Sequence, residues 1–390
     1  MRIALVIETM DTSRGGRETS TAQIASALVR RGHQVAILCR RGSWRGEGVE
    51  VVALGRRGLT RAGRLRNFVA DVQRAIHDGR YDVVHAMLPV PGADVYQPRG
   101  GTVPAQLEAS LRRRWLLGRW AVKLTEPLNR RRRAMADLER HVAADPRILC
   151  LAVSRMVAEE LSRHYGRTDN VRVIFNAVDA PDPECPDRAD WRQRLRFQLG
   201  VSQGDPVFLT VATNFGLKGV AEAIEAFASW YHSGNQRRNA RLVVVGREEP
   251  EGYRRHAGLR DVGGQVVFVP PTPEVFPWYA AADACILLSW YDPCSRVVLE
   301  ATRWGIPSIT TAYNGAAEIL ADGAGIIVES PRDRGAIVAA FEELTDPQRR
   351  EARAEACRRV ADRLSMDRHV EELLEAYEEV GRGGAARGSP

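Results

Sequence analysis

The chain has 390 residues and a formal charge of +7, with 44% hydrophobic and 27% charged residues. This composition is typical of a soluble globular protein, and the length predicts about two domains because a single core rarely grows this large. The apolar run before Glu8 is too short for a signal peptide or a membrane span, so we expect a cytoplasmic protein.

In the first half of the chain, short runs rich in apolar and β-branched residues alternate with helical patterns. The helical pattern is clear where Leu65, Phe68 and Val72 recur at the spacing of one helix face. Such alternation predicts a buried parallel sheet covered by helices. The expected strands are 2–7, 34–39, 49–54, 81–86 and 148–153.

Two adjacent glycines follow the first predicted strand. Gly15 and Gly16 precede a helix that we expect to run to Arg31. Glycines at a helix N-terminus let backbone amides approach a phosphate closely, although a flexible turn would have the same composition. The stretch is not G-x-G-x-x-G, which argues against a nicotinamide dinucleotide.

The segment 111–133 holds the excess positive charge. Nine of the 56 basic residues and one of the 49 acidic residues lie there, which leaves 47 bases and 48 acids in the rest of the chain. Trp115 and Trp120 lie among these bases, a pattern typical of a segment that docks on an anionic membrane surface. The alternatives are a solvated helix with inward-packed tryptophans and a nucleic-acid groove, and the neutral remainder argues against nucleic acid.

The alternation of strands and helices resumes after a proline-rich stretch at 176–190, which we interpret as a linker. The expected strands of the second half are 206–211, 241–246, 265–269, 283–288, 306–310 and 325–328. The fold class is therefore α/β, with two doubly wound, Rossmann-like domains whose parallel sheets face across a cleft. Ligands are expected at the carboxyl ends of the strands.

Lys218 follows a predicted strand and stands near the start of a helix. The chain has only two lysines, Lys123 and Lys218, against 54 arginines. A lysine at this place suggests that a compact point charge is needed, as for contact with a diphosphate, although a surface lysine is the alternative.

Two acids flank the start of another predicted helix. Asp292 lies in a loop after a strand, Ser295 is a good helix N-cap, and Glu300 lies a turn and a half into the helix. Helical side chains tilt towards the N-terminus, so both carboxylates can point at a site where helix amides favour an anion. The plainer interpretation makes Asp292 a turn residue and Glu300 a surface acid.

The cysteines and the remaining acids do not predict a metal site. The six cysteines are scattered without C-x-x-C spacing, and we expect them to be reduced. The acids of the linker are interpreted as solvated charge. His85 ends a predicted strand and could face the cleft, but a satisfied buried histidine fits the position equally well.

The layout resembles the retaining glycosyltransferases of family 4, which have two Rossmann-like domains in the GT-B fold. The resemblance rests on the glycine loop, on "FGLKG" at 215–219, and on "DPCSRVVLEATRWGIPSITTAYNGAAEIL" at 292–320. Within the family the chain is most similar to the lipopolysaccharide core glucosyltransferases, from "PGADVY" at 91–96 and the basic aromatic segment after it. The resemblance implies domains at 1–178 and 190–364, with a helix at 365–381 that packs back on the first domain.

The resemblance also implies roles for individual residues. Lys218 would contact the donor diphosphate, Asp292 would hold the donor sugar, and Glu300 would hold the ribose. Asp94 would lie at the cleft floor, near the acceptor or the donor sugar. Phosphate oxygens would be bound at the glycine loop and by helix amides, namely Gly15, Gly16, Ser295, Arg296 and Val297.

The implied activity is metal-independent transfer of glucose from UDP-glucose to a glycolipid or lipopolysaccharide-core acceptor. UDP-glucose would be a co-substrate, and no further cofactor is implied. The enzyme would act at the inner face of the cytoplasmic membrane, docked through 111–133. The alternatives are a nucleotide-sugar epimerase and a non-catalytic scaffold protein.

Three residues depart from the family pattern. Asp292 replaces a Glu and so shortens the reach by roughly 1.3 Å. Leu217 stands where many relatives have Arg, for which Arg296 could substitute. Ser20 stands where the core glucosyltransferases carry an acid.

Overall fold

The computed structural model describes residues 1–79, 81–234 and 239–385. The chain forms two compact units: unit 1 comprises 1–177 and the chain from 365 onward, and unit 2 comprises 178–364. Unit 1 was expected to end at 178 and unit 2 to begin at 190, whereas unit 2 begins at 178 and so includes most of the proline-rich stretch. The six cysteines are free thiols in the structure.

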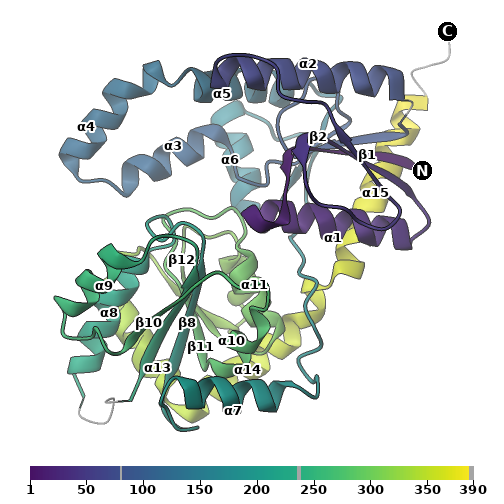
Figure 1. Ribbon diagram of the computed structural model, residues 1–390. Coiled ribbons are helices and arrows are strands. Elements are labelled where there is room, and N and C mark those ends of the chain that lie inside the picture. Colours follow the sequence, from purple (N-terminus) through teal and green to yellow (C-terminus); the bar gives the residue numbers. More distant parts are fainter. Residues whose placement is uncertain (80, 235–238, 386–390) are drawn as a thin grey trace. The chain divides into compact units, whose positions relative to one another are not determined.

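Unit 1 is built on a parallel sheet with the strand order β3-β2-β1-β4-β5-β6-β7 (Figure 1). The strands are β1 (Arg2–Met10), β2 (Gln34–Gly42), β3 (Val49–Ala53), β4 (Val83–Ala86), β5 (Val95–Tyr96), β6 (Leu149–Ala152) and β7 (Val171–Val173). The helices are η1 (Thr12–Arg14), α1 (Gly16–Arg30), α2 (Arg61–Gly79), α3 (Val103–Arg112), α4 (Leu116–Thr125), η2 (Glu126–Leu128), α5 (Arg130–Ala144), α6 (Arg155–Tyr165) and α15 (Met366–Ala385).

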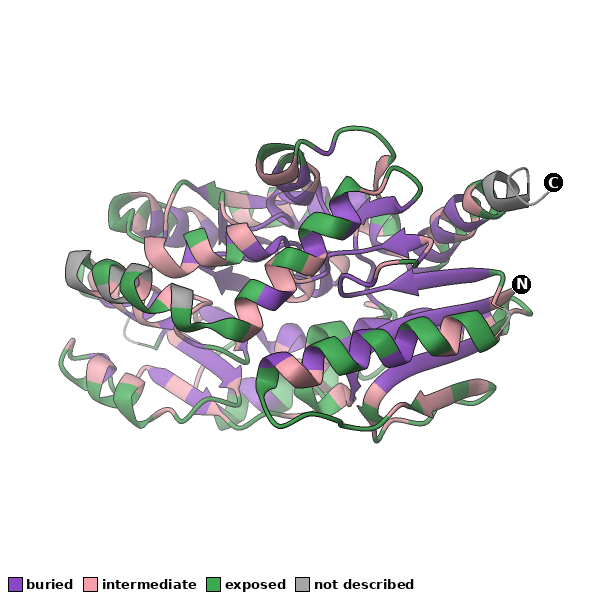
Figure 2. Ribbon diagram, turned by 90° about the horizontal axis from the view of Figure 1, so that it is seen from above, coloured by how far each residue is buried: buried purple, intermediate pink, exposed green. Residues whose placement is uncertain are grey.

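Alternate residues of β1 supply the two cores of unit 1. Leu5 packs on one face of the sheet with residues of α1 and α15, and Val6 packs on the other face with Phe68 of α2. Because successive side chains of a strand point to opposite faces, one continuous apolar run serves both layers. Figure 2 shows the resulting pattern, with buried strands in purple and the outward faces of the helices in green.

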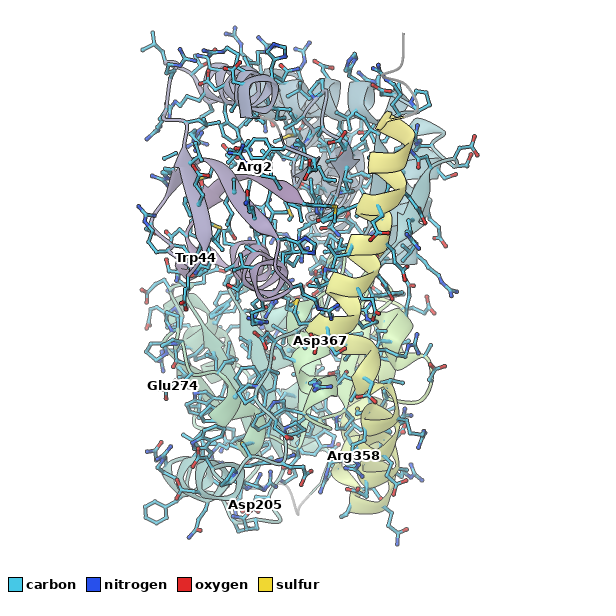
Figure 3. All side chains as sticks on the ribbon, turned by 90° about the vertical axis from the view of Figure 1, so that its right-hand side faces the viewer. Arg2, Trp44, Asp205, Glu274, Arg358 and Asp367 are labelled. Carbon is cyan, nitrogen blue, oxygen red and sulfur yellow. The ribbon has the colours of Figure 1, made fainter. Side chains whose placement is uncertain are left out.

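The C-terminal helix α15 belongs to unit 1. Leu373 and Tyr377 are fully buried in the core that also contains α1, and the ring of His369 hydrogen-bonds the carbonyl of Phe175 at 2.7 Å. Figure 3 shows α15 as a long yellow helix, with Asp367 near its start.

Unit 2 is built on a second parallel sheet, with the order β10-β9-β8-β11-β12-β13. Its strands are β8 (Val207–Ala212), β9 (Arg241–Gly246), β10 (Val266–Val269), β11 (Ala284–Leu287), β12 (Ser308–Thr311) and β13 (Gly325–Val328). Its helices are α7 (Arg188–Gln198), α8 (Val220–His232), α9 (Glu251–Gly258), α10 (Phe276–Ala281), α11 (Arg296–Arg303), α12 (Ala317–Leu320), α13 (Arg334–Thr345), α14 (Pro347–Val360) and η3 (Ala361–Leu364).

Aromatic rings fill one side of the unit 2 sheet. Phe208 of β8 meets Phe341 of α13 edge-on, with ring centroids 4.5 Å apart, and also contacts Trp230 of α8. The neighbouring residue Leu209 points to the opposite face, where it packs with Tyr279 and Trp304. The two helical layers are thus held by adjacent residues of the central strand.

The predicted strands correspond closely to those of the structure. The prediction missed two short strands, β5 and β7, of two and three residues. The segment 111–133 spans the end of α3, all of α4, η2 and the start of α5, and α3 and α4 extend away from the unit 1 sheet (Figure 1). Among the described residues, no helix combines the length and the apolar character needed to span a membrane.

Candidate functional site

The candidate site of unit 2 lies at the carboxyl ends of three neighbouring strands. Strands β8, β11 and β12 are adjacent in the sheet, and each is followed by a loop that carries polar residues. The carboxyl edge of a parallel sheet is the usual ligand-binding edge of a doubly wound domain. Lys218, Asp292 and Asn314 lie on these three loops.

The loop that carries Lys218 is fixed by its neighbours. The amide of Lys218 donates to the carbonyl of Asn214 at 3.0 Å, and the amide of Trp290 donates to the carbonyl of Leu217 at 2.9 Å. Gly219 has a φ of +69°, and a Cβ there would lie 2.1 Å from the carbonyl oxygen of Leu288. Only glycine fits so close to β11, so the loop places Lys218 above the end of that strand.

Lys218 and Asp292 form an ion pair between their side chains. The side chain of Asp292 is 11% exposed and that of Lys218 is 19% exposed, so the pair is largely shielded from water. The sequence-predicted acid and base are therefore brought together at one edge of the sheet. An anion placed here would meet an ammonium group that is already positioned.

Asn314 organises the loops around this pair, and the sequence interpretation did not single it out. Its amide oxygen accepts from the backbone N–H of Ser295 at 3.2 Å and of Ala316 at 3.0 Å. Its amide nitrogen donates to the hydroxyl of Thr310 at 2.9 Å. The Asn-Gly pair in the loop after β12 was the available signal, but such a pair indicates only a turn.

The loop of Asp292 pairs with the loop of Asn314 through the backbone. The amide of Asp292 donates to the carbonyl of Tyr313 at 2.9 Å, and its carbonyl accepts from Gly315 at 2.8 Å. Both loops are therefore held against each other, which fixes the carboxylate relative to the sheet.

Helix α11 starts at the expected place. Ser295 is its N-cap, but its side chain makes no capping hydrogen bond, and its amide is used by Asn314. That bond contradicts the expectation that the Ser295 amide is available to a phosphate. The amides of Arg296 and Val297 open the helix and remain the candidates, where the helix dipole favours negative charge.

Glu300 is buried, and both of its carboxylate oxygens have partners. One oxygen accepts from the guanidinium of Arg296 at 3.0 Å, and the other accepts from the hydroxyl of Tyr279 at 3.0 Å. Burial and the adjacent carboxylate hold the pKa of Tyr279 well above its ordinary value, so the hydroxyl stays a donor. Arg296 is thus tied to Glu300 in this structure rather than presented as an extra phosphate contact.

In unit 1, Gly15 and Gly16 lie after β1, at the carboxyl edge of the sheet. Gly15 has a φ of +151° and precedes α1, and Gly16 is the first residue of that helix. A pocket of about 650 Å³ lies at this edge and is lined by Arg14, Arg17 and Glu18 from the same loop and helix. The glycine loop therefore adjoins a polar pocket, as expected for a ligand-binding edge. Ser20, on the same helix, is 2% exposed.

The position of Asp94 contradicts its predicted role. Asp94 precedes β5, so it lies at the amino edge of the sheet, opposite the glycine loop. Its carboxylate accepts from the backbone N–H of Val84 at 2.8 Å, which ties β4 to the loop before β5. Burial raises the pKa of this carboxyl. The residue closes a backbone contact and is not near the expected sugar site.

His85 is fully buried, and of its two ring nitrogens Nδ1 has a hydrogen-bond partner whereas Nε2 has none among the described residues. Its ring Nδ1 lies 2.6 Å from the hydroxyl of Tyr377, and burial together with the charge of Arg99 lowers its pKa to about 3. Within the described part of the chain, no group of three or more His, Cys, Asp or Glu side chains gathers as metal ligands.

Two family models match the chain, one in each half. Residues 14–181 match the model described as Glycosyltransferase Family 4, and residues 192–360 match the model described as Glycosyl transferases group 1. The first match ends at 181, within the proline-rich stretch 176–190, and the second begins at 192, just after it.

The chain is similar to proteins that have been named or solved. It is 28% identical over 356 residues to the lipopolysaccharide glucosyltransferase WaaG of Escherichia coli strain K12. The aligned region covers 89% of this chain and 91% of that protein. A crystal structure of WaaG, described as a glycosyltransferase involved in lipopolysaccharide biosynthesis, superposes with a TM-score of 0.80 and 25% identity over 95% of this chain and 98% of that one. A structure of Anabaena Alr3699/HepE in complex with UDP and glucose has a TM-score of 0.70 and 18% identity, over 97% of this chain and 99% of that one, and supports the fold alone.

Proposed function

The chain belongs to the glycosyltransferases with the two-domain GT-B fold, and we propose that it transfers glucose from UDP-glucose to a glycolipid or lipopolysaccharide-core acceptor. The donor is proposed to bind at the carboxyl edge of the unit 2 sheet. The acceptor is proposed to bind at the corresponding edge of unit 1.

The ion pair of Lys218 and Asp292 is the observation that carries this proposal. A cation and a carboxylate stand together beside the first turn of α11. The ammonium group and the helix amides suit the diphosphate, and the carboxylate suits the hydroxyls of the sugar attached to it. Glu300, held by Tyr279 and Arg296, is the proposed ribose contact.

The proposed reaction breaks the bond between the anomeric carbon and the diphosphate oxygen and forms a bond from that carbon to an acceptor oxygen. The departing diphosphate takes the proton of the acceptor hydroxyl, and the sugar keeps its configuration. The protein contributes stabilisation of charge on the leaving diphosphate, through Lys218 and the α11 amides, without a bound metal ion.

Attachment to the inner face of the cytoplasmic membrane is proposed for the segment 111–133. Trp115 and Trp120 are 82% and 71% exposed, and Leu124 and Leu128 are 80% and 77% exposed. Large apolar side chains exposed among arginines suit the headgroup region of an anionic bilayer. The similarity to WaaG favours a lipopolysaccharide-core acceptor, which is itself a membrane component.

A panel of nucleotide sugars tests the proposal. The full chain is incubated with UDP-, ADP- and GDP-sugars, with and without a truncated lipopolysaccharide acceptor, and both nucleoside diphosphate and glycosylated product are measured. We expect release from one donor and a product one sugar heavier.

Two other results of the panel would point to other functions. Conversion of the sugar without release of diphosphate would favour an epimerase. No binding or release with any donor would favour a non-catalytic scaffold.

A further inference from the structure

The pocket at the carboxyl edge of the unit 1 sheet has an unusual lining. Its volume is about 650 Å³, and residues of β1, the end of β2, the loops after β4 and β5, and the starts of α1, α2 and α5 surround it. Nine arginines and three glutamates line it, a formal excess of six positive charges. No other charge enters the lining, since its remaining members are neutral side chains.

The three glutamates of the pocket offset only part of its positive charge. Glu8 is shared by two arginines, with Arg40 at 3.0 Å and Arg131 at 2.7 Å. Glu139 is 1% exposed and accepts from the hydroxyl of Tyr96 at 2.6 Å and from the amide of Val103 at 2.7 Å. Glu18, the third acid, lies 4.0 Å from Arg17. All three acids therefore have partners within the protein.

The arginines stand where helix electrostatics disfavour them. The N-terminus of a helix carries partial positive charge, and acids are the usual residues of the first turn. The first turns of α2 and α5 contain no acid. Arg61 and Arg64 occupy the first turn of α2, and Arg131 and Arg132 occupy that of α5, all four lining the pocket. Arg131 is paired with Glu8 and Arg132 with Glu126, whereas among the described residues Arg61 and Arg64 have no acidic partner. Local rules broken as in α2 are found at functional sites, where a ligand compensates the repulsion.

The arginines of the lining differ from one another in their ion pairing. Within residues 1–79, 81–234 and 239–385, the structure gives no acidic partner to the exposed side chains of Arg41, Arg56 and Arg61. Arg41 lies at the end of β2, Arg56 in the loop after β3 and Arg61 at the first position of α2, and all three line the pocket. Guanidinium groups bind phosphates and carboxylates with paired hydrogen bonds.

We propose that this pocket binds a saccharide acceptor that carries at least two phosphate or carboxylate groups. The unpaired arginines would bind those anionic groups, and the neutral polar side chains of Thr9, Gln106 and Asn129 in the lining would face the sugar hydroxyls. The identification of the occupant as the acceptor rests on the proposed glycosyltransferase function. The binding of an anionic saccharide in the pocket does not rest on that function. An experiment can therefore contradict the glycosyltransferase function without contradicting the binding, and the reverse.

Titration of inositol hexakisphosphate into the full chain by calorimetry is the first test, because its phosphates are carried on a ring. The double variant Arg56→Gln/Arg61→Gln should weaken binding by about tenfold or more, since two charge-assisted contacts are lost. The control Arg255→Gln/Arg359→Gln removes two exposed arginines of unit 2 and should bind within about twofold of the unchanged chain. Failure of the unchanged chain to bind, or equal loss in both double variants, would overturn the proposal.

A second measurement separates the acceptor from the donor and from lipid. In the absence of acceptor, Arg56→Gln/Arg61→Gln and the unchanged chain should release diphosphate from the donor at equal rates. In transfer to a phosphorylated saccharide, the double variant should have a KM for that saccharide about tenfold higher than that of the unchanged chain. If no donor is turned over by the unchanged chain, the proposed function fails but the titration result stands. If phosphatidylglycerol vesicles displace the inositol phosphate and the double variant loses vesicle binding, the pocket takes a lipid headgroup, and the saccharide assignment is wrong.

Discussion

Lys218 and Asp292 lie 74 positions apart in the chain and form an ion pair at the carboxyl edge of the unit 2 sheet. The position of Lys218 is determined by the close approach of Gly219 to the end of β11. The position of Asp292 is determined by backbone hydrogen bonds with the loop of Asn314. The shorter aspartate, in place of the family's glutamate, is long enough to reach the ammonium group.

The carboxylate of Asp292 is expected to be essential for turnover of the donor. Asp292→Asn should lower release of nucleoside diphosphate by about a hundredfold, because it removes the proposed sugar contact and leaves Lys218 without its partner. Asp292→Glu restores the charge and should stay within about tenfold of the unchanged chain. Equal activity of Asp292→Asn and the unchanged chain, measured with the same donor, would remove this residue from the site.

Gly219 is expected to be irreplaceable for steric reasons. Gly219→Ala places a methyl group against the Leu288 carbonyl at a positive φ, and should lower the free energy of unfolding of unit 2 by about 2–4 kcal/mol. Gly252→Ala is the matched control, because a Cβ there meets no atom within 4 Å. Calorimetric Tm values of both variants check this, and a Gly219→Ala protein as stable as the control would show that the loop can move aside.

Unit 1 is expected to lose stability as the pH falls below about 6.5. The folded-state pKa of His85 is about 3, and that of His369 is also lowered by burial, whereas an unfolded histidine titrates near 6.5. Between these values the unfolded chain binds protons that the folded chain does not, so the free energy of unfolding falls by up to about 1.4 kcal/mol per pH unit for each histidine.

Variants separate this effect from other acid-sensitive groups. His85→Gln should make the dependence of the unfolding free energy on pH shallower between pH 4 and 6.5, and His141→Gln, at an exposed position, should leave it unchanged. Denaturant unfolding of the two variants at several pH values measures the slopes. Identical slopes would mean that His85 takes up its proton without unfolding.

The exposed tryptophans of the basic segment are expected to govern attachment to membranes. Trp115→Ser/Trp120→Ser should reduce co-sedimentation with phosphatidylglycerol vesicles by about tenfold or more, since both rings would leave the bilayer interface. Phe197→Ser removes an exposed aromatic ring of unit 2, 84% exposed, and serves as the control. If all three proteins sediment equally, the segment has another role.

The fold could be predicted from the sequence because buried parallel strands are continuous apolar runs. The short strands β5 and β7 escaped, since two or three residues carry no periodic signal. The composition singled out Lys218, and the resemblance placed both Lys218 and Asp292 in the donor site. The role of Asn314 could not be predicted, because it depends on a backbone geometry that an Asn-Gly pair does not reveal.

Less of the candidate site could be predicted from the sequence in unit 1 than in unit 2. Asp94 was assigned from its local motif, which does not tell at which end of the sheet a residue lies. The excess charge was attributed to a single membrane-docking segment, yet Arg131 and Arg132 of that segment line the pocket together with arginines from the first 64 residues. That arginines distant in the chain line one pocket becomes apparent only once the strands are ordered in the sheet.

Release of nucleoside diphosphate by the full chain and by Lys218→Ala is the most direct test of donor binding at the edge of the unit 2 sheet. Arg255→Ala is measured alongside as a control for the loss of an exposed cation. We predict that one nucleotide sugar is turned over, and that Lys218→Ala lowers the rate by about a hundredfold or more because the leaving diphosphate loses its cation. Turnover that is unchanged in Lys218→Ala, or absent for every donor in the unchanged chain, would contradict the account.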